Sequence, residues 1–197
     1  MNRFLIWFMH PDRQSFNGAI LDTYADELKK QGKEIDIRTI AELDLSPHLF
    51  PDEYNASLEG RYPDVIKKEH EKMEWADVIT FIFPLWWGSF PAAGKGFLDR
   101  VLSYGFAYEL EGETPVPRMK GKKAAMIYTT GTPEEKFIEK GSKCRIEETW
   151  KEEIFSFCGF DCLPFLHFGD VIQASDTKRQ QMLEKVRKYA RKHTDMR

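Results

Sequence analysis

The sequence has few cysteines, and they lack the arrangement of a disulfide framework or a zinc centre. The three, Cys144, Cys158 and Cys162, are odd in number and form no Cys-x-x-Cys pair. Isolated thiols of this kind are typical of proteins that stay in a reducing compartment. We therefore expect buried free thiols, no metal site and a cytoplasmic location.

A strong charge of either sign and a long apolar run are also missing. The formal net charge is −3, from 29 Lys and Arg against 32 Asp and Glu, which gives no electrostatic basis for binding nucleic acid. The first apolar run, residues 4–9, is too short for a signal peptide or a membrane span. These absences argue against a nucleic-acid-binding or membrane-spanning protein and favour a soluble one.

Linkers, repeats and low-complexity segments are absent from the sequence as well, so residues 1–197 are expected to form a single domain. Hydrophobic residues make up 42% of the chain, which is enough for a substantial core. Aromatic residues reach 14%, a high share. They either only fill that core, or in part line a site for a flat ligand or a subunit interface.

Apolar segments alternate with helical patterns along the chain. Strands are predicted for residues 3–9, 33–40, 78–84, 124–130 and 161–168. Helices are predicted for residues 16–31, 64–75, from Ser89 onward with Ser89 as cap and Pro91 in the first turn, about 146–157, and 176–193. Residues 41–63 contain three prolines and no clear period, which predicts a long functional loop. The alternation predicts an α/β fold: a five-stranded parallel sheet with helices on both faces.

Ligands of such sheets bind beyond the carboxyl ends of the strands, and the loop of residues 10–17 lies at the first of these ends. A helix that starts after this loop offers free N–H groups to a phosphate, and Ser15, His10 or Arg13 can add donors or charge. The two standard nucleotide fingerprints, Gly-x-Gly-x-x-Gly and Gly-x4-Gly-Lys-Ser/Thr, are absent. From spacing alone, an ordinary loop with a capping serine and a solvated arginine is the favoured interpretation.

The segment of residues 84–91 follows the most strand-like stretch of the chain. Its adjacent residues Trp86 and Trp87 cannot both turn the same way, so one can enter the core while the other forms the wall of a flat pocket. Gly88 permits a close approach of the backbone to a ligand. The alternative is a pair of core or interface tryptophans.

The third strand-end loop, residues 129–133, consists of small and hydroxyl-bearing residues that can pass close to a ring, although an ordinary turn has the same composition. All three loops fall on one edge of the predicted sheet. A phosphate loop beside an aromatic wall suits a nucleotide with a tricyclic ring, which is a flavin. A flavin carries its own redox chemistry, and the protein supplies position and electrostatics.

These motifs resemble the NAD(P)H dehydrogenase (quinone) family, which includes DT-diaphorase-type enzymes and ancillary oxidoreductases of bacterial potassium-efflux systems. The resemblance rests on residues 75–92, 95–101 and 105–108, on His10 with residues 15–17, on the turn at residues 129–131 and on residues 157–160. It implies a flavodoxin-like three-layer sandwich, a homodimer with sites at the subunit interface, and non-covalent FAD or FMN with NAD(P)H as electron donor.

Residues carried over from the family motif form three groups. His10, Ser15, Phe16 and Asn17 would surround the flavin phosphates. Pro84, Leu85, Trp86, Trp87 and Gly88 would line the ring system, and Thr129, Thr130, Gly131, Thr132 and Pro133 would approach its pyrimidine end. Tyr108 would reach toward nicotinamide or quinone, in the site of the partner subunit.

The sequence departs from the family pattern after the third loop. Family members carry a tyrosine and then a histidine there, which help to settle charge on the reduced flavin. Here Phe137 stands in place of the tyrosine, and no histidine lies between Pro133 and Trp150. The nearest cations in sequence are Lys136, Lys140 and Lys143.

The resemblance implies an enzyme that transfers two electrons, as hydride, from NAD(P)H to quinones or similar flat acceptors by a ping-pong mechanism. The alternative is a flavin-binding ancillary subunit of a membrane cation-efflux system, whose partner would meet the basic C-terminal helix. A flavodoxin-type electron carrier is a third class, but such carriers are strongly acidic and this chain is nearly neutral.

Overall fold

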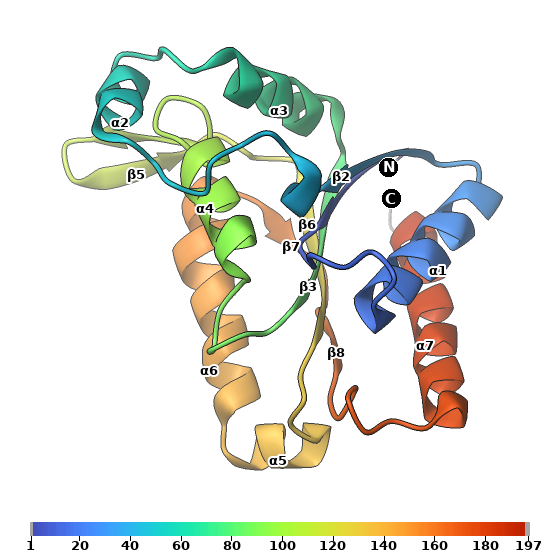
Figure 1. Ribbon diagram of the computed structural model, residues 1–197. Coiled ribbons are helices and arrows are strands. Elements are labelled where there is room, and N and C mark those ends of the chain that lie inside the picture. The colour runs from blue at the N-terminus through green and yellow to red at the C-terminus, as the bar shows by residue number, and fades with distance from the viewer. Residues whose placement is uncertain (1, 196–197) are drawn as a thin grey trace.

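A computed structural model describes residues 2–195, which form a three-layer α/β sandwich (Figure 1). The central sheet contains β1 (Arg3–Phe8), β2 (Glu34–Thr39), β3 (Val78–Pro84) and β6 (Lys123–Thr129), in the order β2-β1-β3-β6. All of these strands are parallel, with Phe4 opposite both Ile35 and Val78, and Val78 opposite Lys123. The expected fold class is confirmed.

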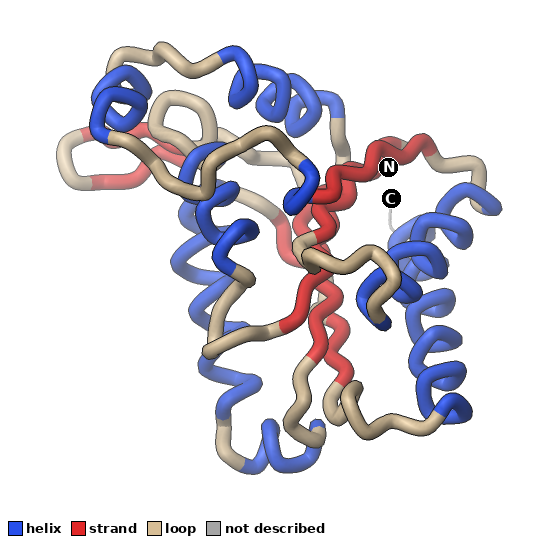
Figure 2. Tube along the Cα trace, in the orientation of Figure 1, coloured by secondary structure: helices blue, strands red, loops and turns tan. Residues whose placement is uncertain are grey.

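Helices cover both faces of the sheet. The helices α1 (Phe16–Lys30) and α7 (Asp176–Asp195) pack on one face, as Figure 1 shows. The opposite face carries α3 (Asp64–Trp75), α4 (Ala92–Val101), α6 (Ser142–Trp150) and the π-helical turn η2 (Lys151–Ser156) that continues α6. Figure 2 shows the strands enclosed between these two helical layers.

Successive side chains of a strand point to opposite faces, and this alternation divides the core in two. Phe4, Ile6 and Phe8 of β1 pack toward α1 and α7. Leu5 and Trp7 pack toward the other helical layer. Because both faces are buried, the strand reads as a continuous apolar run in the sequence, as a central parallel strand should.

The fifth strand position differs from the prediction. Residues 161–168 form two short strands, β7 (Asp161–Cys162) and β8 (Leu166–Phe168), and both pair in parallel with β6. The break includes Pro164, whose ring removes the backbone N–H that a ladder needs. The sheet thus has five strand positions, the last of which is shared by two strands.

The loop predicted for residues 41–63 is partly helical, so that prediction was wrong. It begins in a short 3-10 turn, η1 (Ile40–Glu42), and contains the helix α2 (Pro51–Leu58). Tyr54 and Leu58 of α2 are exposed rather than packed in the core. A helix without a buried apolar stripe gives no periodic signal in the sequence, which explains the error.

Other departures are local. The helix α4 begins at Ala92 after Pro91 without a side-chain cap, so Ser89 does not cap it. An antiparallel hairpin that was not predicted, β4 (Tyr108–Glu111) with β5 (Thr114–Pro117), projects beside α2 (Figure 1). A further short helix, α5 (Glu134–Glu139), precedes α6.

The cysteines are free, but only Cys158 is buried; Cys162 is half-buried and Cys144 is exposed. Within residues 2–195, no helix combines the length and apolarity needed to cross a membrane. The same range contains no cluster of three or more His, Cys, Asp or Glu side chains suited to holding a metal ion.

Candidate functional site

A cleft of about 370 Å³ opens at the carboxyl edge of the sheet. The loops after β1, β3 and β6 meet there, as expected for a parallel sheet. Most of the predicted cofactor residues line it, together with two residues from the segment after β8: His10, Ser15, Phe16, Asn17, Pro84, Leu85, Trp86, Thr129, Thr130, Gly131, Val171 and Ile172.

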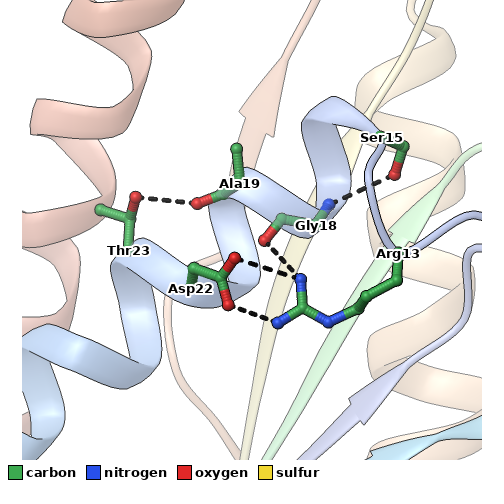
Figure 3. Close-up of polar contacts among 6 residues, drawn as sticks. All are labelled: Arg13, Ser15, Gly18, Ala19, Asp22 and Thr23. Carbon is green, nitrogen blue, oxygen red and sulfur yellow. Dashed lines mark hydrogen bonds and ion pairs between the residues drawn. The ribbon is translucent and has the colours of Figure 1, made fainter.

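The start of α1 forms one end of the cleft. Ser15 caps the helix, and its Oγ accepts a hydrogen bond from the N–H of Gly18 at 3.3 Å (Figure 3). The first turn contains no acidic residue, so its backbone N–H groups and the positive end of the helix dipole remain suited to an anion.

Arg13 does not supply the extra charge considered from the sequence. Its guanidinium group pairs with Asp22 and donates to the carbonyl oxygen of Gly18 at 3.1 Å, so it braces the loop against α1 (Figure 3). A methyl group added at Gly18 would collide with the carbonyl oxygen of Arg13. The loop therefore lies on the helix at a distance that only glycine permits.

Hydrogen bonds join the three loops into one wall. The Asn17 amide donates to Oγ1 of Thr129 at 3.0 Å, and the N–H of Leu85 donates to the carbonyl oxygen of Thr129 at 2.8 Å. Nδ1 of His10 accepts a hydrogen bond from the backbone N–H of Asp12 at 2.9 Å, so the N–H of a neutral ring is at Nε2. These bonds fix the cleft residues on rigid strand ends.

The two tryptophans lie at the mouth of the cleft, and neither enters the core, contrary to the sequence interpretation. Trp86 is half-exposed and packs edge-on against His10 at 5.8 Å. Trp87 is fully exposed, with a backbone φ of +53°, and Gly88 follows with φ of +77°. Positive φ at both central positions makes a type I′ turn, which Ser89 closes by two hydrogen bonds to Trp86. A bulky aromatic residue in this strained and exposed position suggests a functional role.

Several predicted residues do not line the cleft. Trp87 and Gly88 form the turn at its rim, and Pro133 lines a neighbouring hollow on the outer side. Thr132 accepts a hydrogen bond from the Thr130 hydroxyl through its carbonyl oxygen. Sequence reasoning in turn missed Val171 and Ile172, which follow β8 in a loop without any recognisable motif.

Tyr108 does not line the cleft. It lies on another surface of the same chain. It packs against Phe157 at 4.8 Å and borders a hollow beside α4. Partial burial raises the pKa of its hydroxyl. Its placement in a partner subunit's site stays a prediction.

Phe137 of α5 is buried, and its ring lies 5.0 Å from the ring of His167, a histidine that the sequence interpretation did not single out. Of the three lysines considered as replacement cations, Lys143 pairs with Glu134 at 3.3 Å. Phe137, His167, Glu134 and Lys143 thus form one cluster of neighbouring side chains.

A second cleft of about 420 Å³ adjoins the first and shares Ser15 and Phe16 with it. It runs between the start of α1 and the start of α7, and its other lining residues are Gln14, Ala19, Asp176, Arg179, Gln180 and Leu183. The Arg179 guanidinium group lies over the Phe16 ring at 5.9 Å, and its Nε is buried without a hydrogen-bond partner.

The sheet order, the two helical layers and the cleft at the carboxyl edge define a flavodoxin-like α/β protein. The comparisons agree: a model of the family with the flavodoxin-like fold matches residues 2–191. Among solved structures, an NAD(P)H:quinone oxidoreductase from Methanothermobacter marburgensis superposes with a TM-score of 0.87 and 26% identity, over 96% of this chain and 98% of that one.

Curated relatives narrow the class further. An uncharacterized NAD(P)H oxidoreductase from Haemophilus influenzae is 35% identical over 181 residues, which cover 91% of this chain and 90% of the relative. The human ribosyldihydronicotinamide dehydrogenase [quinone] is 30% identical, over 91% of this chain and 86% of the relative. The chain belongs to the NAD(P)H:quinone oxidoreductase family of flavodoxin-like proteins.

Proposed function

We propose that the chain is a flavin-dependent NAD(P)H oxidoreductase that reduces quinones and similarly flat acceptors by two electrons. The observation that carries this proposal is the cleft that joins the start of α1 to the turn at Trp86 and the loop at Thr130. A bound flavin would supply the hydride chemistry. The family relationship supports both the cofactor and the donor.

The residues present fit such a group. The helix start, capped by Ser15 and free of acidic side chains, suits the phosphate. Apolar side chains of Leu85, Trp86 and Ile172 offer flat surfaces to a ring. A Cβ at Gly131 would lie 3.0 Å from Ile172, so the wall is tight on that side.

The cofactor would be FAD rather than FMN. The second cleft begins where the first one ends, at Ser15 and Phe16, and it has room for an adenosine group. The Phe16 ring and the Arg179 guanidinium group provide stacking and hydrogen-bonding surfaces there. Denaturing the purified protein and identifying the released flavin by mass tests this choice, and release of FMN alone would contradict it.

The dimer expected from the family has support in exposed apolar side chains. Leu49, Phe50, Tyr54 and Leu58, on and beside α2, are exposed. Large exposed apolar residues of this kind mark interaction surfaces. We propose that a second copy covers them, which sedimentation at micromolar protein checks directly; a monomer at those concentrations would contradict it.

One site that donor and acceptor occupy in turn predicts ping-pong kinetics. Initial rates with NADH or NADPH against 1,4-benzoquinone should give parallel double-reciprocal lines. Intersecting lines would show that both substrates bind together and would contradict a shared site.

Two capping serines provide a matched test of the site itself. Ser15 caps α1, and Ser175 accepts the N–H of Lys178 in the same way, each at 3.3 Å. Replacing either by alanine should cost about 1 kcal/mol of stability through the lost cap. Ser15 lines both clefts and Ser175 lines neither, so Ser15→Ala should weaken flavin retention more than Ser175→Ala does. Equal retention in the two variants would remove the start of α1 from the site.

A further inference from the structure

His167 is a buried histidine directly behind the wall of the cleft. It lies on β8, its side chain is fully buried, and its Nε2 lies 2.9 Å from Oγ1 of Thr130, a residue that lines the cleft. The mechanism proposed above does not use it.

The hydrogen bonds around Thr130 fix the tautomer of this histidine. The Thr130 hydroxyl donates its only proton to the carbonyl oxygen of Thr132 at 2.8 Å. Nε2 of His167 must therefore carry a proton and donate it to Oγ1 of Thr130. Nδ1 is left with a lone pair, and it is buried without a hydrogen-bond partner.

An unpartnered nitrogen in a protein interior costs free energy, so its presence requires an explanation. Oε1 of Glu134 lies 3.8 Å from Nδ1, just beyond hydrogen-bond range. The Glu134 side chain is 41% exposed, so it reaches water on the outer side of the wall. Thr130, His167 and Glu134 thus form a line from the cleft to solvent.

The surroundings of the His167 ring keep it neutral before reduction. Tyr128 of β6 stacks on it at 4.6 Å and keeps its hydroxyl turned to Glu147, and Lys143 of α6 pairs with Glu134. Burial lowers the pKa of His167 to about 4, with Glu134 opposing the shift and Lys143 adding to it. The resting imidazole is therefore neutral near pH 7.

We propose that His167 takes up one proton at Nδ1 when negative charge arises in the cleft, and that the resulting imidazolium stabilises this charge electrostatically from behind Thr130. This inference rests on the proposed function. Reduction of a quinone by NAD(P)H consumes one proton in addition to the hydride, and water must supply it. His167 takes its proton from solvent by way of Glu134, so that an Nδ1–H bond forms, and it returns this proton by the same route once the acceptor has taken the consumed proton from solvent and the charge in the cleft is gone.

The magnitudes permit this switch. An opposite charge within about 4–6 Å raises the pKa of a histidine by about 1–3 units, and two such charges act together. One is the new charge beyond Thr130, and the other is Glu134, which already opposes the effect of burial from 3.8 Å and adds only what its closer approach to Nδ1–H contributes. Because Thr130 separates His167 from the cleft, the ring touches no reacting atom and is a positioning residue; it takes the place that the sequence leaves vacant at Phe137.

Nitrogen NMR of the flavin-loaded protein, labelled at histidine, observes this proton directly. We expect the neutral Nε2–H form of His167 before reduction, and the imidazolium form after anaerobic reduction with dithionite at pH 6. His193 is the internal control, because it is also buried with one unpartnered ring nitrogen. It lies near the C-terminal end of α7, where its Nδ1 forms a hydrogen bond with the Tyr24 hydroxyl. It should stay neutral. An unchanged His167 would overturn the inference.

Substitutions distinguish proton uptake by His167 from the structural role of its buried ring. His167→Gln keeps a donor for Thr130 but cannot take up a proton, and we expect proton uptake on reduction at pH 6 to fall by up to about one per molecule. Glu134 is half-exposed and Glu135 is exposed; Glu134→Gln should reduce uptake, whereas the neighbouring Glu135→Gln should not. Wild-type uptake in both His167→Gln and Glu134→Gln would also overturn the inference. If the protein binds no flavin, its visible spectrum shows this before any proton is measured. A failure of the proposed function is therefore distinguishable from a failure of the inference on His167.

Discussion

The turn at the rim of the cleft provides a test that separates stability from function. Its central residues are Trp87 and Gly88, both with positive φ, and two hydrogen bonds of 3.1 and 3.0 Å between Trp86 and Ser89 close it. We predict that Trp87→Asn makes the protein more stable and less active. The pair Asn-Gly is the sequence that type I′ turns favour most.

The magnitude follows from burial and backbone strain. The Trp87 side chain has a relative exposure of 104%, so its removal costs no buried apolar area within the chain. Holding a non-glycine residue in the left-handed region costs about 1–2 kcal/mol, and asparagine relieves most of this cost. We expect a gain of about 1 kcal/mol, which raises the melting midpoint by about 2–4 °C in a domain of this size.

Equilibrium urea unfolding of the flavin-free protein measures the stability, and NADH oxidation with 1,4-benzoquinone measures the activity of the loaded protein. Trp86→Asn is the control, because Trp86 is partly buried against His10 and lines the cleft. Trp86→Asn should lower both the free energy of unfolding and the rate of NADH oxidation. Loss of more than about 1 kcal/mol in Trp87→Asn with activity unchanged would refute the reasoning, since the ring would then serve packing alone.

Three further outcomes follow from other contacts. Gly18→Ala should push the loop at Arg13 off the start of α1 and weaken flavin binding by about tenfold or more, measured by fluorescence titration. Arg100→Leu should cost about 3–5 kcal/mol in urea unfolding, because it strands the buried carboxylate of Glu53, and adding Glu53→Leu should restore most of the loss. Burial lowers the pKa of His193 from 6.5 to about 4, so the unfolded chain binds more protons below pH 6.5. Titration of His193 alone should therefore lower the free energy of unfolding by about 3 kcal/mol between pH 6.5 and 4, and His193→Gln should remove this part of the slope in unfolding curves.

Most of the fold could be predicted because each central strand is buried on both faces. Such strands appear as unbroken apolar runs, as in β1 and β3, and the helices between them carry apolar stripes. The helix α2 gave no such signal because its apolar residues face outward. The hairpin of β4 and β5 is short and half-exposed, and a pattern of that length is ambiguous.

The cleft was predictable only in part. Loops at strand ends share one edge of a parallel sheet, so His10, Trp86 and Thr130 could be brought together from their positions in the sequence alone. The contact of His167 with Thr130 spans 37 residues and depends on the break between β7 and β8. The outward turn of Trp87 depends on a backbone conformation that tryptophan rarely adopts, so composition suggested burial instead.

The central claim is that the cleft binds a flavin that NAD(P)H reduces and a quinone reoxidises. The most direct measurement is the visible spectrum of the purified protein, recorded anaerobically before and after NADH or NADPH and again after 1,4-benzoquinone. We predict an oxidised flavin spectrum that bleaches with the donor and returns with the quinone. Absence of bound flavin after loading with both FAD and FMN, or a bound flavin that neither donor bleaches, would contradict the claim.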